Sequence, residues 1–184
     1  VSRTMLGRPS SLDSNKHQGS PHPEFLGAGS EAGLEIWRIE DKVPVLWPKE
    51  KHGTFCSGDS YICLKTTISK SGHSWDIHFW LGKESSVDEV GIAAIKTVEL
   101  DDSLGGLPNQ YRETQGYESS QFQSLFKKHI MYLDGGVASA FRHVERDEYP
   151  VRFFHLKGKR NVRVTQIPLS SDMNSGDVFI LAMG

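Results

Sequence analysis

The feature that most constrains this chain is a tripeptide that occurs twice, each time directly before a run of β-forming residues. Residues 57–64 read SGDSYICL and residues 175–182 read SGDVFILA. Each copy follows two β-rich runs joined by a short polar turn, LEIWRIEDKVPVLWP at 34–48 and VRFFHLKGKRNVRVTQIP at 151–168. The two aspartates, Asp59 and Asp177, are 118 positions apart. That period has the size of a domain and exceeds the repeating units of solenoid proteins.

The repeat predicts the domain organisation. We expect one complete domain over residues 25–144, an acidic linker over 145–150 and the beginning of a second domain over 151–184. Residues 1–24 are rich in Ser, Pro, His and Gly, a composition typical of a flexible arm. The last segment of about 34 residues is too short to bury a core by itself. It is therefore expected to be truncated, and the chain to be the front of a longer protein.

Composition and charge exclude several classes of protein. The 184 residues carry a formal net charge of −2, which argues against a general nucleic-acid binder. No apolar run approaches the roughly 20 residues that a transmembrane segment needs, and no signal peptide is recognisable. Cys56 and Cys63 lie seven positions apart around the first Ser-Gly-Asp, too far along a strand for a disulfide. Two free thiols favour a reducing compartment, so a cytoplasmic protein is expected.

Periodicity predicts a covered strand followed by a long helix. Residues 74–81, SWDIHFWL, have apolar side chains on both faces, as in a central strand. Ser86 with Glu89 three positions later forms a capping-box pattern, and Gly105–Gly106 gives a stop signal, so we expect a helix over 85–106. The apolar stripe expected to be buried consists of Val87, Val90, Ala94 and Val98.

Three further elements are expected after this helix. Residues 109–115 read as a short strand, 119–133 as a second helix and 135–144 as an edge strand. Strands followed by helices on a mixed sheet predict a layered α/β (α+β) domain.

Several carboxylates stand where a carboxylate is unfavourable. Asp101 and Asp102 fall in the last turn of the expected helix, at the negative end of its dipole. Asp59 opens a buried-looking strand, although Asp is rare in strands. Solvated acids, and a capping role for Glu89, account for these positions as well as a bound cation does. If a cation is bound, carboxylates together with carbonyls of the Gly135–Gly136–Val137 loop would select a hard ion such as Ca²⁺.

Six stretches, taken together and in order, resemble the first domain of the gelsolin, severin, fragmin and villin family. They read HPEFLGAGSEAGLEIWRIE, SGDSYICLKT, DIHFWLGKESSVDEVGIAAI, ELDD, RETQGYES and GGVASAFRHV. KGKRNVRVTQIPLSSDMNSGDVFIL resembles the opening of the family's second domain. The resemblance covers residues 22–184. It implies a gelsolin-like fold, with a sheet of about five strands between one long and one short helix. It also implies a cytoskeletal protein that severs actin filaments or caps their barbed ends under calcium control, and that is modulated by phosphoinositides.

The resemblance also implies metal ligands. One calcium ion would be held by the carboxylates of Asp59 and Glu89 and by the carbonyls of Gly58 and Val137. A second ion, shared with an actin carboxylate, would use Asp101 and the carbonyls of Gly106 and Pro108. The second Ser-Gly-Asp copy would contribute Gly176 and Asp177 to a further metal site.

Two kinds of partner follow from the same resemblance. The actin contacts would be Ile95, Asp101 and Phe141, and Ile95 lies off the apolar stripe of the expected helix, as an exposed contact requires. Phosphatidylinositol bisphosphate would meet two basic stretches. Their candidate residues are Lys127 and Lys128 in the first, and Arg152, Lys157, Lys159, Arg160 and Arg163 in the second.

Alternatives from other classes remain. An enzyme is disfavoured because the sequence has neither a nucleophile elbow nor a phosphate-binding loop. His73 and His78 lie five apart, on opposite faces of a strand, so they are poorly placed to share a metal. A scaffold with the same fold and no calcium switch is a second alternative. Loss of the acidic ligands would support it, but Asp59, Glu89 and Asp101 are all present. A protein that caps filaments and does not sever them is the third.

Overall fold

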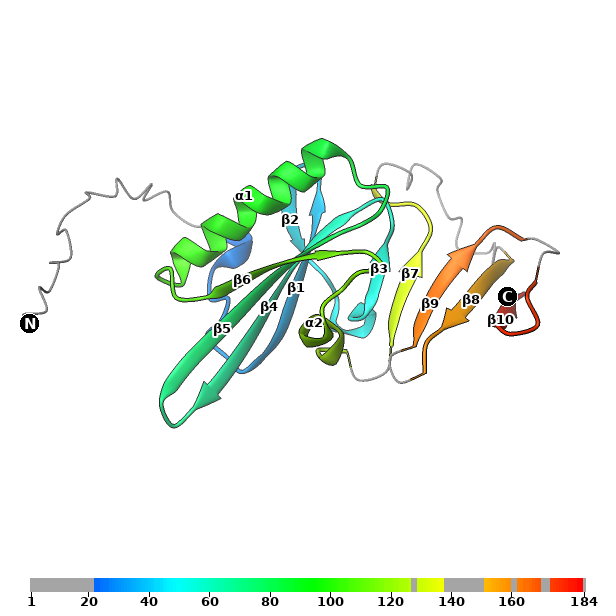
Figure 1. Cartoon of the computed structure of the whole chain (residues 1–184). Coiled ribbons are helices and arrows are strands. Elements are labelled where there is room, and N and C mark those ends of the chain that lie inside the picture. Colours follow the sequence, from blue (N-terminus) through cyan, green and yellow to red (C-terminus); the bar gives the residue numbers. More distant parts are fainter. Residues whose placement is uncertain (1–21, 127–128, 138–150, 160–161, 170–172, 184) are drawn as a thin grey trace, which may run out of the picture.

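The computed structural model describes residues 22–126, 129–137, 151–159, 162–169 and 173–183. Two 3-10 turns, Pro23–Phe25 and Lys49–Lys51, accompany the helices and strands labelled in Figure 1. The bounds of these elements are β1 Gly33–Glu40, β2 Val43–Leu46, β3 Thr54–Cys56, β4 Ser60–Ser69, β5 Gly72–Leu81, α1 Val87–Ser103, β6 Asn109–Thr114, α2 Ser120–Ser124, β7 Ile130–Leu133, β8 Arg152–Lys157, β9 Arg163–Ile167 and β10 Val178–Ala182.

The first sheet has five strands in the order β2-β1-β4-β5-β6. All neighbours are antiparallel except β5 and β6, which run parallel and are joined through α1. A two-residue turn at Asp41 and Lys42, both with positive φ, joins β1 to β2, and this backbone twist matches that of a tight hairpin. The predicted fold class, an α/β protein with a mixed sheet of about five strands, is confirmed.

Alternation along β4 divides the hydrophobic core between the two faces of this sheet. Ile62 and Leu64 pack under α1, whereas Tyr61 and Cys63 point to the opposite face. That opposite face is covered by α2, β3 and β7, through residues such as Phe122. Figure 1 shows α1 along one side of the sheet and these elements on the other. The sheet therefore lies between a long and a short helix.

The long helix is confirmed, but its predicted buried stripe is wrong except at Val90, which is half-buried against the core. The capping box is present, since Ser86 caps the helix and Glu89 bonds back to it. The residues buried against the sheet are Ala93, Thr97 and Leu100. In contrast, the side chain of Val87 is 88% exposed and that of Val98 is 50% exposed. Two stripes share helical spacing in this segment, so apolarity alone does not identify the one that faces the core.

The predicted second helix over 119–133 is also wrong in extent. Helix α2 spans five residues, and residues 130–133 form strand β7. Ile130 and Tyr132 are buried at alternate positions, which is the period of a strand. The predicted strands at 74–81 and 109–115 are confirmed as β5 and β6. The one expected at 135–144 lies outside the described residues from 138 onward, and so does the linker at 145–150.

A second sheet runs in the order β10-β8-β9-β7-β3. Its strands β9, β8 and β10 repeat the antiparallel arrangement of β2, β1 and β4, so the sequence repeat is also a structural one. Strand β9 pairs in parallel with β7, which in turn pairs in parallel with β3. The second sheet thus joins strands from both sides of the predicted linker, and the domain boundaries stay a prediction.

Candidate metal site and exposed helix face

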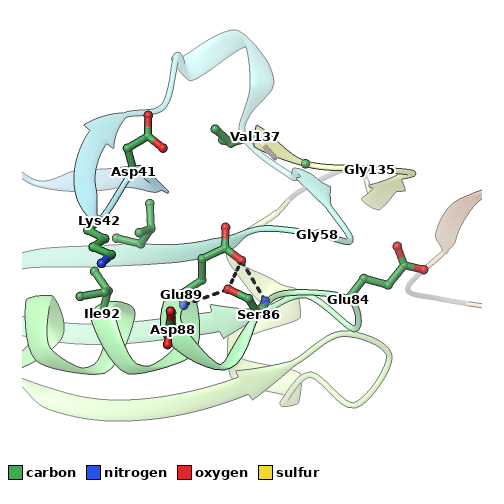
Figure 2. A pocket seen from close by; sticks show the side chains of 12 residues that line it. Asp41, Lys42, Gly58, Glu84, Ser86, Asp88, Glu89, Ile92, Gly135 and Val137 are labelled. Atoms are coloured by element: carbon green, nitrogen blue, oxygen red, sulfur yellow. Dashed lines mark hydrogen bonds between the residues drawn. The ribbon is translucent and has the colours of Figure 1, made fainter. Parts of the chain in front are cut away.

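A pocket of about 490 Å³ opens where four segments meet. These are the β1–β2 turn, the loop before β4, the beginning of α1 and the loop after β7. Among its lining residues are Gly58, Glu89 and Val137, three of the four ligands predicted for the first ion. Figure 2 shows the Glu89 carboxylate rising from α1 toward the side of the pocket that holds Val137 and Gly135.

The fourth predicted ligand, Asp59, lies directly behind this pocket. Its Oδ1 accepts a hydrogen bond of 2.7 Å from the Val137 main-chain N–H. One residue earlier, the Gly58 N–H donates to the Gly135 carbonyl over 2.7 Å. A Cβ on Gly136 would stand 2.3 Å from Asp59 Oδ1, so only glycine lets these loops approach this closely. The structure therefore brings the four predicted donors of the first site into one neighbourhood.

Asp59 is a buried carboxylate whose negative charge is only partly balanced. Its side chain has no exposed surface, and the guanidinium of Arg38 lies 3.6 Å from Oδ2. Burial raises the pKa of the Asp59 carboxyl, and the nearby Glu89 carboxylate adds to the rise. The Val137 N–H, Arg38 and Tyr61 act in the opposite direction. A cation between Asp59 and Glu89 would offset the cost of burying the charged Asp59 carboxylate and the repulsion between the two carboxylates.

Glu89 has the capping role that the sequence left open. Its Oε2 accepts hydrogen bonds of 2.9 Å from both the N–H and the hydroxyl of Ser86, drawn as dashed lines in Figure 2. The Glu89 N–H donates in return to Ser86 Oγ over 3.2 Å. Because Glu89 also lines the pocket, capping fixes the position of its carboxylate and does not remove it from the site.

The donor set fits a hard cation. Two carboxylates and two main-chain carbonyls are all oxygen donors, the kind that Ca²⁺ takes in groups of about 6 to 8. Within the described part of the chain, no three side chains of His, Cys, Asp or Glu form a group that could hold a metal ion. Any ion held here must accordingly take main-chain carbonyls or water as further ligands.

The second predicted site lies at the far end of α1. Asp101 has a half-buried side chain, and its Oδ1 is buried without a hydrogen-bond partner. The Gly106 N–H donates to the Asp101 carbonyl over 2.9 Å, which folds the following turn back onto the helix end. Pro108 directly precedes β6. A buried carboxylate oxygen without a donor, at the negative end of a helix, fits a cation better than it fits a solvated surface acid.

The outer face of α1 is apolar and exposed. Ile95 is 56% exposed, as predicted, and it stands on the same outer surface as Val87, Ala94 and Val98. Asp101 follows them in the last turn of the helix, which ends at Ser103. Phe141, the other predicted actin contact, lies outside the described residues.

The second Ser-Gly-Asp copy forms a tight turn. The Asp177 N–H donates to the Asn174 carbonyl over 3.1 Å, and the Gly176 N–H donates to Asn174 Oδ1 over 3.2 Å. The Asp177 carboxylate lies 3.3 Å from Nε2 of His155 on β8. The predicted ligands Gly176 and Asp177 therefore lie in one turn, and the His155 imidazole faces the Asp177 carboxylate.

The predicted lipid-binding residues differ in exposure and in their contacts. Arg152, Lys157 and Lys159 are exposed, whereas Lys127, Lys128 and Arg160 lie outside the described residues. Arg163 is different, because its guanidinium lies 3.5 Å from Glu118 Oε2. This pair places Arg163 in the contact between β9 and the first unit.

Sequence reasoning missed Glu118. Its Oε1 accepts hydrogen bonds from Trp80 Nε1 at 3.1 Å, the Gly116 N–H at 3.0 Å and the Tyr132 hydroxyl at 2.6 Å. Burial and the neighbouring Glu118 raise the pKa of Tyr132, so its hydroxyl keeps its proton. In the sequence Glu118 stands between Tyr117 and Ser119, a pattern that does not predict such a network.

Comparison with known proteins identifies the family. Residues 42–123 match the model of the gelsolin repeat. Over 164 residues, or 88% of this chain, the sequence is 57% identical to cytoplasmic gelsolin of Homarus americanus. Over 157 residues, or 84% of the chain, it is 55% identical to Villin-5 of Arabidopsis thaliana. The chain belongs to the gelsolin and villin family.

The matched part of these gelsolin-family relatives is short. The chain spans 22% of the lobster protein and 16% of the Arabidopsis protein. A solved Thorarchaeota 2DGel3/rabbit actin complex contains a chain that is 21% identical, with a TM-score of 0.46, covering 80% of this chain and 71% of that one. The residues matched to the gelsolin repeat include Asp59, Glu89 and Asp101. No helix in the described residues has the length and apolarity to span a membrane.

Proposed function

We propose that this chain is an actin-binding part of a gelsolin-family protein that severs filaments or caps their barbed ends under calcium control. The proposal depends above all on the outer face of α1. That face presents Ile95 and Val98 to solvent and ends at Asp101, whose Oδ1 is buried without a partner. An exposed apolar stripe on a rigid helix is suited to a groove on a partner protein, and the family relationship makes actin that partner.

Calcium would act at both ends of α1. At its beginning, Asp59, Glu89 and the carbonyls of Gly58 and Val137 would hold one ion and fix the helix to the loops beside it. At its end, Asp101 and the carbonyls of Gly106 and Pro108 would offer an incomplete set of oxygens, which an actin carboxylate would complete. A bound ion would supply positive charge beside the buried Asp59 carboxylate and the half-buried carboxylates of Glu89 and Asp101. The role is binding and regulation, with no catalysis, in the cytoplasm.

Phosphoinositide binding would use the exposed bases of the second basic stretch. Arg152 and Lys157 are five positions apart on β8, so they point to opposite faces and lie about 17 Å apart. A headgroup would therefore meet Lys157 and Lys159 together, and Arg160 next to them in sequence. Co-sedimentation with vesicles containing phosphatidylinositol bisphosphate would test this assignment, which fails if Lys157→Glu with Lys159→Glu leaves binding unchanged.

Titration of fluorescently labelled actin monomer tests the actin-binding proposal, in calcium and in chelator. Ile95→Asp places a charge in the apolar contact and should weaken binding in both buffers. Asp101→Asn should weaken binding in calcium only, because it removes a ligand of the shared ion. Full actin binding by Ile95→Asp would contradict the proposed contact face. Wild-type affinity of Asp101→Asn in both buffers would contradict the shared ion.

A further inference from the structure

Two walls of the candidate calcium pocket are joined behind it by main-chain hydrogen bonds. One wall is the Ser57–Asp59 loop, and the other is the turn over residues 82–86 that leads into α1. The Gly82 N–H donates to the Asp59 carbonyl over 3.0 Å, and the Glu84 N–H donates to the Ser57 carbonyl over 2.8 Å. The distance from Asp59 to Glu89 therefore depends on how these two segments are held together.

One side chain, that of Gln115, bonds to both walls. It follows the last residue of β6, and its Oε1 accepts a hydrogen bond of 2.8 Å from the Lys83 N–H. Its Nε2 donates to Ser57 Oγ over 3.0 Å. A main-chain N–H can only donate, so the amide oxygen must face Lys83 and the amide nitrogen must face Ser57. The orientation of the amide is thus determined by its partners.

The backbone of Gln115 is fixed as well. Its N–H donates to the Leu81 carbonyl over 3.0 Å, which continues the pairing of β5 with β6. The side chain accordingly starts from the rigid edge of the first sheet and reaches two segments. One is the loop that carries the proposed ligands Gly58 and Asp59, and the other is the turn that leads into the helix of Glu89. Ser57 is buried, so its hydroxyl has little access to water as a substitute partner.

We infer that Gln115 is a positioning residue for calcium at the Asp59–Glu89 site, an inference that rests on the calcium site proposed above. Gln115 contributes no oxygen to the proposed ion. It holds the Gly58 carbonyl and the Asp59 carboxylate at a set distance from the helix that carries Glu89. Residues that orient metal ligands without touching the metal typically change affinity 10- to 100-fold when they are removed.

Two substitutions at this position separate hydrogen bonding from size. Gln115→Met keeps the length of the side chain and loses both hydrogen bonds. Gln115→Glu keeps an oxygen for the Lys83 N–H, and its second oxygen can accept from the Ser57 hydroxyl, which is free to rotate. We expect calcium affinity to fall 10- to 100-fold in Gln115→Met and to remain at or above the wild-type value in Gln115→Glu.

The measurement is calorimetric titration of the 184-residue chain with calcium chloride, with a thermal melt of each variant in chelator. Glu89→Gln identifies the heat that belongs to the first site. Gln110→Met, at an exposed position on β6, controls for an added methionine in the strand that leads to Gln115. Ile130→Val, in the core of the opposite face, controls for a general loss of stability and should leave calcium affinity unchanged.

The outcomes separate the two hypotheses. If wild type shows no calcium binding that Glu89→Gln removes, the calcium site itself is wrong and the inference falls with it. If that binding is present and Gln115→Met retains wild-type affinity, the site stands and Gln115 has no positioning role. An equal loss of affinity in Gln115→Met and Ile130→Val would likewise overturn the inference, because the effect would then follow stability alone.

Discussion

The two Ser-Gly-Asp copies have the same place in a repeated three-strand arrangement but different surroundings. In each, the aspartate ends the loop before a strand, and a basic side chain on the neighbouring strand faces it. For Asp59 that side chain is Arg38 on β1, at 3.6 Å. For Asp177 it is His155 on β8, at 3.3 Å. Asp59 is fully buried, whereas the side chain of Asp177 is 31% exposed.

The difference shows that distant segments, and not the tripeptide, determine the chemistry of the aspartate. Asp59 receives the Val137 N–H from 78 positions further along the chain, and Ser57 receives Gln115 from 58 positions away. The bonds within the turn of the second copy come from Asn174, three positions before Asp177. A motif of three residues thus fixes a turn before a strand, while burial and metal-binding character depend on the rest of the fold.

Alanine substitution at the glycine of each Ser-Gly-Asp copy should give the largest difference in stability between the two copies. A Cβ on Gly58 would stand 2.9 Å from the Gly135 carbonyl oxygen, so one of two backbones must move. At Gly176 the nearest atom is Asn174 Oδ1 at 3.8 Å, an ordinary contact. We expect Gly58→Ala to lower the free energy of unfolding toward the upper end of about 1 to 3 kcal/mol. Gly176→Ala should change it by less than about 0.5 kcal/mol. Urea denaturation in chelator measures both, and equal effects would contradict the difference in packing.

The two basic partners give a smaller expected difference. Arg38→Gln would leave the buried Asp59 carboxylate without its guanidinium, at a cost of about 1 to 2 kcal/mol in chelator. His155→Gln should cost less than about 0.5 kcal/mol, because water already reaches Asp177. Thermal melts of the two variants at neutral pH decide this. A His155→Gln variant as unstable as Arg38→Gln would show that Asp177 depends on its partner as much as Asp59 does.

The smallest expected effect on stability concerns the ion pair between Arg163 on β9 and Glu118. Arg163→Gln removes the positive charge that β9 brings to Glu118. Because the Arg163 side chain is 36% exposed and its guanidinium lies 3.5 Å from the Glu118 carboxylate, we expect the free energy of unfolding to fall by about 1 kcal/mol. The companion variant Lys157→Gln, at an exposed position on β8, should be neutral. Limited proteolysis should release residues 151–167 more readily from Arg163→Gln than from Lys157→Gln. Indistinguishable digestion of the two variants would mean that strand pairing alone holds β9.

Local signals predicted the elements, and non-local contacts decided their roles. The capping box at Ser86 and Glu89 identified the start of α1. The run of β-forming residues after the first Ser-Gly-Asp identified β4, and apolar side chains on both faces identified β5. The buried face of α1 was missed because Ala93 and Thr97 are small, and a stripe of larger valines has the same spacing. The roles of Gln115 and Glu118, and the pairing of Arg163 with Glu118, were missed because each is an ordinary polar residue until the fold brings its partners close.

Strand β3 has a consequence for the order in which the chain can assemble. In the second sheet β3 pairs with β7, whose last residue, Leu133, is made 77 residues after Cys56. At synthesis rates of about 5 to 20 residues per second, that separation is about 4 to 15 seconds on the ribosome. During that interval the β3 edge has no partner in its own sheet. Completion of this sheet is therefore necessarily late, whereas the hairpin of β4 and β5 can close as soon as Leu81 has emerged.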